Sequence, residues 1–598
     1  MSHLEKVLLL GVDGLIPELV DRFCDEGALP NIQRLRDEGT TTRLMPYIST
    51  WGDTNFVTFL SGQAPGNSWV GQRMPPRDTR HLLELMNEAG KKCALVHFPE
   101  SLVPTGEHDL CLAPYWSGQG PAPMELASAG LHTSDPAAWP EVPQHEALGW
   151  PPSGTLAHHQ KHNRLPIERS AGEYHAAIRL NGGGSLPVTL TPEGDGRVSL
   201  SLDAQHTTLD VGEWSGWLPV DTAHGAGQVR FKLLAHDIAT GRLDLLQSQI
   251  TIPEQLSNQP ALADRLIRRH GPFIAKWAVS ADPDTLYHET SFEEGRYQLE
   301  WLVDSALTLL DEEDFSLFAT VFRLNDETHH TCLAYCDPAS PFFSATRQAE
   351  YLEAIRCSYR LLDDAVGRLL AGCREDTLLV LASDHGDVPN HYLCDIHRRL
   401  AEFDLCTLDD RGRPVIERSR AFLKDERGGL EIFVNRDLVA VPDVADVQTR
   451  ILKALTTWYV DTPAGERNVV ALAVKGEDAG ILGYWGEHRG DVLFAYASGF
   501  VWGVNRRGDT VAPVQSAGAN HGPQIPSAST DFASNLGLAI FHGSGVRAGQ
   551  ALPANGLRRM DDPGATFARV LGLETATLDG KPLDILGESR APSGRPLS

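Results

Sequence analysis

The segment Lys6–Gly14, "KVLLLGVDG", indicates the fold class. An apolar run from Val7 to Val12 ends at Asp13, which is typical of a strand buried on both faces of a parallel sheet. Asp13 interrupts the run and no small-residue cleavage site follows, so the segment is a poor signal peptide. We therefore predict a buried strand that carries an acidic residue at its carboxyl end.

Strand and helix patterns alternate along the chain after this predicted strand. Amphipathic helices are predicted at 29–39, 54–62 and 81–92, and strands at 41–48 and 93–98. The alternation returns later with helices at 291–313 and 346–372, and with strands that begin at 315 and 376. The fold class predicted by this order is α/β, with a doubly wound, mainly parallel sheet, helices on both faces and a β-rich insertion.

The length of 598 residues exceeds what one hydrophobic core supports, so we expect a core with large insertions. Period-two alternation predicts the β-rich insertion, and segments rich in Pro, Gly and Ser predict a lid. The predicted division is a core in three parts, a lid or loop region, the β-rich insertion and a second insertion or cap: 1–110, 256–393 and 512–598 for the core, 111–166 for the lid, 167–255 for the insertion and 394–511 for the cap.

Composition excludes several partners. The formal net charge of −27 argues against a nucleic-acid duplex or an anionic membrane, and we expect no membrane-spanning segment. A small anionic substrate stays compatible with this charge if metal ions dominate the local field. Nine cysteines without a CxxC pair predict reduced thiols and a cytoplasmic location, with Cys332 and Cys336 packed in the core.

Polar residues stand at four predicted strand ends or turns. The carboxyl ends of parallel strands are where open α/β sheets bind ligands, and Asp with His suits zinc or manganese. Six residues would supply three ligands to each of two metal ions, an arrangement used for in-line displacement at phosphorus. They are Asp13 in "GVDG", Asp326 and His330 in "NDETHH", Asp384 and His385 in "SDHG", and His521 in "GANHGP".

Each of these motifs alone also has an ordinary structural explanation. A strand-end Asp such as Asp13 often caps a helix or anchors a loop, and the Asp326–His330 spacing also fits a pair on an exposed helix. His521, beside glycine, fits a plain turn. Their joint occurrence at successive element boundaries is what favours the metal site.

The chain resembles the alkaline phosphatase superfamily, in its branch of type I phosphodiesterases and nucleotide pyrophosphatases. Within that branch it is most similar to the predicted phosphohydrolase/phosphomutase-like proteins with a β-rich insertion. The resemblance covers both ends and most of the middle, and is weakest over 112–166 and 407–490. The matching segments include "LLLGVDGLIPELVDRFCDEGALPNIQRLRDEGT", "FLSGQAPG", "GEWSGW", "NDETHH", "LASDHGD", "NHGP" and "VLGLETATLDGKPL".

This resemblance implies a metal-dependent hydrolase of phosphate esters, a phosphodiesterase or nucleotide pyrophosphatase acting on a small phosphorylated or nucleotide-like substrate. It implies two divalent ions, zinc first, with manganese or iron also compatible. One ion would be held by Asp13, Asp384 and His385, and the other by Asp326, His330 and His521. His329 competes with His330, but the family spacing favours His330.

The nucleophile is expected in Pro46–Gly66, "PYISTWGDTNFVTFLSGQAPG". In the superfamily it usually stands ten residues before the glycine that closes the helix, here Gly62, but that position is Gly52. Thr54, at the predicted helix start, and Thr50, in a Thr-Trp pair, are the candidates, in that order. A third alternative is that neither is used. Asn55 is a candidate donor to a non-bridging phosphoryl oxygen.

Three further residues are candidate substrate contacts: His391, Tyr115 and Trp116, the last two in the predicted lid. Two other functions stay open. One is a phosphoryl or nucleotidyl transferase or mutase of the same fold. The other is a non-catalytic metal-binding relic that binds a partner through Trp214 and Trp217, although two such tryptophans more often pack against the host domain. Nothing in the sequence specifies an oligomeric state.

Overall fold

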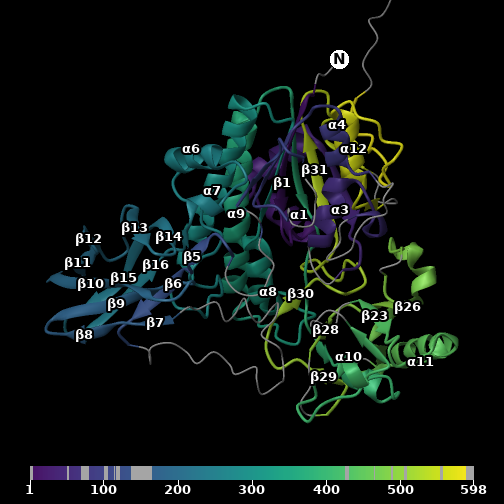
Figure 1. Cartoon of the computed structure of the whole chain (residues 1–598). Helices are drawn as coiled ribbons and strands as arrows, with labels where there is room; N and C mark the ends of the chain where they lie inside the picture. Colours follow the sequence, from purple (N-terminus) through teal and green to yellow (C-terminus); the bar gives the residue numbers. More distant parts are fainter. Residues whose placement is uncertain are drawn as a thin grey trace, which may run out of the picture.

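The computed structural model describes residues 4–49, 53–68, 80–99, 106–113, 115, 122–135, 164–194, 196–423, 430–462, 465–486, 489–503, 508–552 and 557–587 (Figure 1). At its centre is a nine-stranded sheet of order β32-β2-β31-β19-β1-β18-β3-β4, with β33 paired to β2. The strands are β1 (Lys6–Val12), β2 (Thr40–Met45), β3 (Cys93–Val96), β4 (Leu110–Leu112), β18 (Leu317–Phe322), β19 (Thr377–Ser383), β31 (Gly537–His542), β32 (Gln550–Ala551) and β33 (Arg558–Arg559).

Most neighbouring strands of this sheet run parallel. β1 pairs in parallel with β18 on one side and with β19 on the other, and β3 continues the parallel order. Only β31, among the described strands of this sheet, runs antiparallel to both of its neighbours, β19 and β2. The carboxyl ends of β19, β1 and β18 therefore lie side by side, which is where ligands bind in such sheets.

Both faces of the sheet are covered by helices. Leu8, Leu10 and Val12 of β1 belong to one core cluster, whereas Val7 and Leu9 belong to another, because alternate side chains of a strand point to opposite faces. The first cluster includes side chains of α1 (Pro17–Asp25), α2 (Pro30–Glu38), α6 (Pro260–His270), α7 (Glu289–Glu312), α8 (Leu324–Cys336) and α9 (Gln348–Gly372). The second includes side chains of α3 (Asp53–Ser61), α4 (Leu82–Glu88) and α12 (Asp562–Val570). The predicted fold class is confirmed.

The β-rich insertion lies beside this core, at the left of Figure 1. An antiparallel sheet has the order β12-β11-β10-β9-β8, and β13 and β14 form a hairpin. A mixed sheet has the order β15-β16-β6-β7, in which β6 and β7 run parallel. The strands are β6 (Gly130–Thr133), β7 (Arg164–Pro166), β8 (Glu168–Ser170), β9 (Glu173–Arg179), β10 (Ser185–Gly194), β11 (Arg197–Leu202), β12 (Gln205–Asp210), β13 (Leu218–Thr222), β14 (Gly225–Val229), β15 (Phe231–Asp237) and β16 (Arg242–Gln247).

The prediction that 111–166 is irregular throughout was wrong in part. β5 (Glu125–Ala127) pairs with β17 (Ile250–Thr251), and β6 pairs with β16, so this segment contributes strands to the insertion. Periodicity missed them because each strand is only three or four residues long. Residues 116–121 and 136–163 of the predicted lid lie outside the described part of the chain.

The segment predicted as a less regular cap also has ordered elements and a core cluster of its own, at the lower right of Figure 1. Its four-stranded sheet has the order β22-β23-β27-β26, and a three-stranded sheet has the order β28-β21-β29. The elements are α10 (Ile396–Ala401), α11 (Val444–Thr456), β21 (Tyr392–Cys394), β22 (Ala421–Leu423), β23 (Glu431–Val434), β24 (Tyr459–Thr462), β25 (Gly465–Asn468), β26 (Val470–Lys475), β27 (Val492–Tyr496), β28 (Phe500–Trp502) and β29 (Val511–Pro513).

A short two-stranded sheet, β20 (Val388–Pro389) with β30 (Ala519–Asn520), lies next to α8. Among the described residues, no helix combines the length and the apolar character needed to cross a bilayer. Cys332 and Cys336 are buried in the core cluster that α8 shares with α9, as predicted.

Candidate functional site

Six predicted ligands converge at the carboxyl ends of three adjacent strands. Asp13 directly follows β1, and Asp384 directly follows β19. Asp326 and His330 lie on α8, which begins just after β18. His521 comes from a distant part of the chain and follows β30 directly. Because β19, β1 and β18 are neighbours, the side chains meet at one edge of the sheet.

The first group consists of Asp13, Asp384 and His385, whose candidate ligand atoms all lie within 4.8 Å of one another. The Nε2 atom of His385 is 3.3 Å from Asp13 Oδ1 and 3.1 Å from Asp384 Oδ2. The other ring nitrogen, Nδ1, lies 3.2 Å from the carbonyl oxygen of Gly386. A carbonyl oxygen only accepts, so Nδ1 carries the proton and Nε2 is left for a metal ion.

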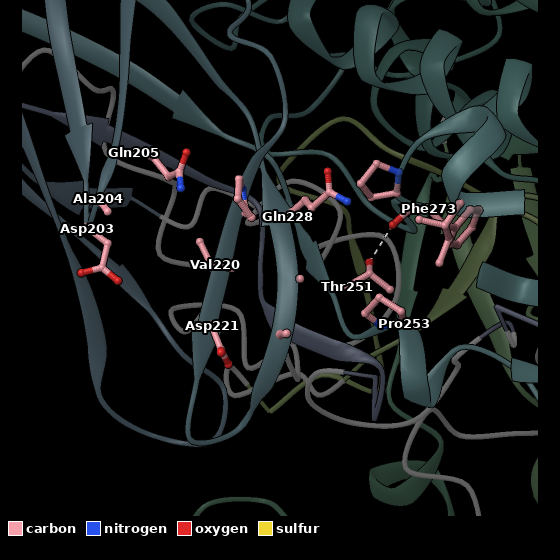
Figure 2. Close-up of a pocket in the computed structure, with 14 residues that line it drawn as sticks. Asp203, Ala204, Gln205, Val220, Asp221, Gln228, Thr251, Pro253 and Phe273 are labelled. Carbon is pink, nitrogen blue, oxygen red and sulfur yellow. Dashed lines mark hydrogen bonds between the residues drawn. The ribbon is translucent and has the colours of Figure 1, made fainter. Parts of the chain in front are cut away.

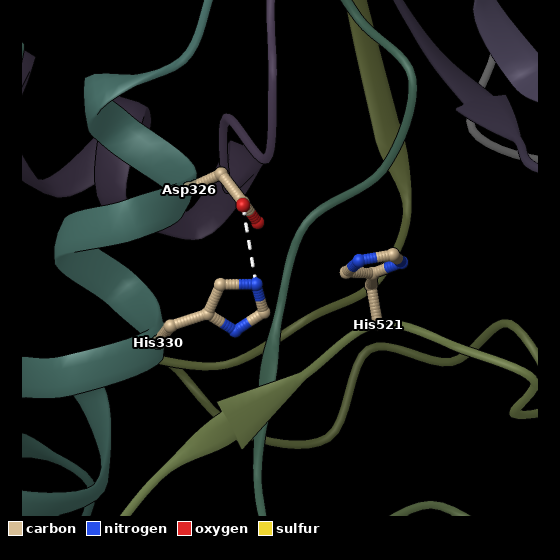
Figure 3. Close-up of side chains that lie close together, drawn as sticks. All are labelled: Asp326, His330 and His521. Carbon is tan, nitrogen blue, oxygen red and sulfur yellow. Dashed lines mark ion pairs between the residues drawn. The ribbon is translucent and has the colours of Figure 1, made fainter. Parts of the chain in front are cut away.

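The second group consists of Asp326, His330 and His521 (Figure 3). Asp326 and His330 are four residues apart on α8 and therefore share one face of the helix, with 3.1 Å between Asp326 Oδ2 and His330 Nε2. His330 Nδ1 donates to the carbonyl oxygen of Ala519 at 2.6 Å. This histidine, like the one in the first group, thus presents Nε2 to the cluster.

The two groups are adjacent. The rings of His385 and His521, one from each group, stack with 3.7 Å between centroids and 9° between planes. The loop after β1 comes close to the backbone of α8 because residue 14 is a glycine, with a φ of +73°. A Cβ at this position would stand 2.9 Å from Cα of Asp326, so a side chain there would push α8 away from the loop after β1.

The donor set fits divalent metal ions. The five residues other than His521 are almost fully buried, with at most 5% of each residue exposed. Asp326 Oδ1, Asp384 Oδ2 and His385 Nε2 are buried atoms that make no hydrogen bond. Burying such atoms is costly unless a partner compensates them, and carboxylate oxygens with imidazole nitrogens are ligands of zinc and manganese.

Electrostatics agrees with this reading. Burial raises the pKa of Asp384 to about 7. Burial would lower the pKa of His330, but Asp326 and Asp387 raise it to about 9, and Asp384 and Asp13 likewise raise the pKa of His385. Metal binding at these residues would therefore have to displace protons.

A known protein family matches most of the chain. The model of the family described as type I phosphodiesterase/nucleotide pyrophosphatase matches residues 7–428. This chain belongs to the type I phosphodiesterase/nucleotide pyrophosphatase family. Five of the six residues above lie within the matched segment, and His521 lies beyond it. No curated protein matches the chain.

Solved structures with a similar fold are distant in sequence. Human ectonucleotide pyrophosphatase/phosphodiesterase 5 is 11% identical, with a TM-score of 0.43, over 96% of this chain and 97% of its own. Phosphonoacetate hydrolase from Sinorhizobium meliloti 1021, in complex with phosphonoacetate, is 11% identical, with a TM-score of 0.44, over 96% of each chain. The alkaline phosphatase PafA is 14% identical, with a TM-score of 0.44, over 98% of this chain and 99% of its own.

Described residues on either side of the predicted nucleophile position lie beside the two groups. Asn55 and Ser49 line a small cavity together with His385 and His521. The amide of Asn55 is bonded to the backbone of Tyr47, accepting from its N–H at 2.8 Å and donating to its carbonyl at 3.2 Å. Asn55 therefore holds the turn in addition to facing the cavity.

The hydroxyl candidates differ in what can be said of them. Thr54 lies in the first turn of α3 and is 7% exposed. Thr50 and Gly52 lie outside the described residues. Ser49 was missed by the sequence analysis, although the Ser-Thr doublet before the turn offered a signal. It lines the same cavity as the histidines, and Asn55 Nδ2 lies 3.5 Å from its Oγ.

The candidate substrate contacts have other neighbours. Tyr115 is buried, and its hydroxyl donates to Asp13 Oδ2 at 2.9 Å. The guanidinium of Arg323 lies over the Tyr115 ring at 4.6 Å and its Nε is 3.6 Å from the same Asp13 oxygen. Tyr115 and Arg323 together thus orient Asp13, leaving its Oδ1 towards His385. Trp116 lies outside the described residues.

His391 and His329 do not join either group. His391 packs against Gly499 beside β21, and its backbone N–H donates to the Gly499 carbonyl at 2.8 Å. Packing, the alternative reading of His391, matches this position. His329 is fully buried, with its Nδ1 3.4 Å from Asp387 Oδ2. Asp387 was not singled out from the sequence, although it ends the motif "SDHGD".

A larger cavity, of about 470 Å³, lies at the insertion and not at the strand ends (Figure 2). Its walls come from the β11–β12 turn, β13, β14 and the segment around Phe273, and the Thr251 hydroxyl donates to the Phe273 carbonyl at 2.6 Å. None of its lining residues is one of the six candidate ligands. This cavity is larger than the one beside the six candidate ligands, so cavity size alone would not have identified the candidate site.

Proposed function

We propose that this protein is a metal-dependent hydrolase of phosphate esters, a phosphodiesterase or nucleotide pyrophosphatase with a two-metal site. One divalent ion is held by Asp13, Asp384 and His385. The second is held by Asp326, His330 and His521. Zinc fits the Asp and His donors best, and manganese or iron is compatible. The substrate is a small phosphorylated or nucleotide-like molecule.

The observation that supports this proposal most is the convergence of the two groups. Residues separated by hundreds of positions are brought within 4.8 Å in each group, and the groups share a stacked histidine pair. Membership of the family supports the reaction class. Structural packing alone does not account for buried carboxylate oxygens without hydrogen bonds.

Bound divalent ions would lower the pKa of a nearby hydroxyl and offset negative charge on the phosphoryl oxygens. The chain itself supplies orientation. His330 and His385 are each fixed through Nδ1 by a backbone carbonyl, so their Nε2 atoms face the cluster. Free N–H groups at the start of α3 favour a phosphoryl oxygen placed there.

The nucleophile is a hydroxyl of the turn between Ser49 and Thr54. Thr54 has the helix N-terminus in its favour, and Ser49 has the cavity that it shares with His385 and His521. Thr50, between them in sequence, stays a candidate from the family's Thr-Trp pair. The attacking oxygen bonds to phosphorus as the ester oxygen leaves with the proton of the hydroxyl. Water then attacks phosphorus, which releases the phosphate product and returns a proton to the enzyme oxygen.

The first experiment loads the purified protein with zinc, and separately with manganese, and measures hydrolysis of bis(p-nitrophenyl) phosphate and p-nitrophenyl phosphate. The proposal expects turnover of the diester that is abolished by chelator and restored by the metal. Metal content per chain is measured on the same samples. Two bound ions with neither ester cleaved, and no transfer to an added alcohol acceptor, would contradict the hydrolase and favour the non-catalytic alternative.

A second set of variants identifies the nucleophile. Ser49→Ala, Thr50→Ala and Thr54→Ala are compared with Thr58→Ala, whose buried hydroxyl donates to the Thr54 carbonyl one turn further along α3. One of the first three is expected to lose about 10³-fold or more in kcat, with metal content unchanged. Thr58→Ala controls for loss of a buried hydroxyl. Equal activity in all four variants would remove the covalent step from the proposal.

A further inference from the structure

Asp387 is a buried carboxylate that the proposed two-metal site does not use. It lies three residues beyond Asp384, and none of its side chain is exposed. Neither of its oxygens makes a hydrogen bond. Its nearest charged or chargeable neighbours are Nδ1 of His329 at 3.4 Å and Nδ1 of His330 at 3.9 Å.

Asp387 lies where the two candidate metal groups meet. One ligand atom each of Asp326, His385 and Asp387 lie within 4.8 Å of one another. Asp326 belongs to the second group and His385 to the first, so this third set joins them. Asp326 Oδ1 and His385 Nε2 also make no hydrogen bond. Candidate ligand atoms from three residues, two of them carboxylates, thus lie close together in the buried interior, which is costly without a compensating cation.

The backbone fixes Asp387 in this place. β20 pairs with β30 so that Val388, the residue after Asp387, is opposite Asn520, the residue before His521, and Asp387 itself forms an isolated bridge with Ser534. On the other side of the strand, a Cβ at Gly386 would stand 2.1 Å from the carbonyl oxygen of Ser534. The segment is therefore held from both sides, and the Asp387 carboxylate is directed inward by the same small sheet that positions His521.

We propose that Asp387 is a further carboxylate ligand of the metal centre, shared with Asp326 and His385 at the junction of the two groups. This rests on the metal site of the proposed function but not on its chemistry. With Asp387 the centre has four carboxylates, which together balance the charge of two divalent ions. The expected cation is one that accepts both oxygen and imidazole donors, such as zinc or manganese.

A structural pair between Asp387 and His329 is the competing explanation. His329 is fully buried, and neither of its ring nitrogens makes a hydrogen bond. If the pair only stabilises the fold, removing the charge of Asp387 harms the protein equally with and without metal. If Asp387 faces a cation, the two conditions give opposite results.

The test is Asp387→Asn in the full chain, with thermal unfolding measured in chelator and in zinc, and zinc affinity measured by competition with a chromogenic chelator. In chelator the variant is expected to be at least as stable as the wild type, because a buried negative charge beside Asp326 is removed. Zinc is expected to raise the unfolding temperature of the variant less than that of the wild type. The affinity of the variant for the more weakly bound zinc ion is expected to be about 10- to 100-fold lower than that of the wild type.

Asp363→Asn is the matched control, because Asp363 is also a buried carboxylate but accepts hydrogen bonds from Ile32 N and Asn31 at the start of α2. It is expected to destabilise the protein equally in both conditions. His329→Gln is expected to keep zinc affinity within a few-fold of the wild type. Should Asp387→Asn not fold, Asp387→Ser in the same titration carries the test.

Unchanged zinc affinity in Asp387→Asn, together with lower stability in chelator, would overturn the proposal and assign Asp387 to the His329 pair. These measurements contain no substrate. A protein that binds zinc through Asp387 but cleaves no ester would therefore contradict the proposed function and leave this inference standing.

Discussion

Two regions of this protein bury charge, and they do so differently. At the strand ends, Asp326, Asp384 and Asp387 each have carboxylate oxygens that no protein group bonds. At the interface between the insertion and α7, the guanidinium of Arg230 lies 4.2 to 4.9 Å from the rings of Trp214, Trp217 and Tyr297. In the first region buried carboxylate oxygens without a hydrogen bond lie beside histidines, whereas in the second region aromatic rings surround the cation.

The interface is also linked by direct bonds. Trp214 Nε1 donates to Glu293 of α7 at 2.7 Å, and Lys232 pairs with the same carboxylate at 2.6 Å. Trp214 and Trp217 therefore pack against the host core, which is the structural alternative that the sequence analysis gave for them. The comparison teaches that a buried charge by itself does not mark a site. A site is indicated where several buried carboxylates and histidines converge within reach of one ion, as at the strand ends.

The largest expected effect comes from removing the charge of a proposed metal ligand at the strand ends. Asp384→Asn should lower kcat/KM for a phosphodiester by about 10³-fold or more, because a ligand of the first group is lost. Steady-state kinetics at saturating zinc measures this, with Asp363→Asn as a control that keeps wild-type activity. Full activity in Asp384→Asn would show that the buried charges at the strand ends do not form the catalytic site.

The interface offers a pH-dependent contrast. Burial raises the pKa of Glu294 to about 8, against a usual value near 4.5, although its carboxylate accepts from Ala278 N–H and lies near Arg230 and Lys232. Between these pH values the folded state holds a proton that the unfolded state has lost. Stability of the wild type is therefore lost as pH rises from about 4.5 to about 8.

Glu294→Gln imitates the protonated form and removes this dependence. The free energy of unfolding of the variant, relative to wild type, should rise by about 1 kcal/mol per pH unit between roughly pH 5 and 8. Urea unfolding at a series of pH values measures the slope. A flat difference for Glu294→Gln would mean that the nearby cations already compensate the carboxylate.

Removing the compensated cation tests the second region directly. Arg230→Met keeps an apolar stem but loses the attraction to three aromatic rings, and should lower the free energy of unfolding by about 2 kcal/mol. Ester hydrolysis at saturating substrate should be unchanged, because the interface is separate from the strand-end groups. Loss of activity without loss of stability would show that the insertion communicates with the site.

The fold class and the candidate metal ligands could be predicted from the sequence for a physical reason. Buried parallel strands appear as apolar runs, and their carboxyl ends mark the edge where ligands meet, so Asp13 and Asp384 were found from local pattern. Asp387 was not found, because its significance depends on the pairing of β20 with β30, which are far apart in the chain. The Tyr115 contact with Asp13 was hidden for the same reason.

Local sequence pattern failed for different reasons at the short strands β5 and β6 and at α8. β5 and β6 are too short for their alternation to be read, and they form strands because β16 and β17 pair with them. The Asp326–His330 spacing also fits an exposed helix, whereas nearly all of α8 is buried. Tertiary pairing and burial decided these elements, and neither is a property of the segment itself.

The smallest expected effect is at a third boundary, where the cap meets the turn that carries the nucleophile candidates. The hydroxyl of Tyr484 donates to the Ile48 carbonyl at 2.6 Å, and Trp485 Nε1 donates to Asn67 at 2.9 Å. Tyr484→Phe should lower kcat for a diester about tenfold while leaving KM and zinc content unchanged, because it frees the turn without touching a ligand. Tyr496→Phe, whose hydroxyl is buried in the cap without a hydrogen bond, is the matched control. If both variants keep wild-type kcat, the turn is held by Asn55 alone, and the cap contributes to folding and not to the geometry of the site.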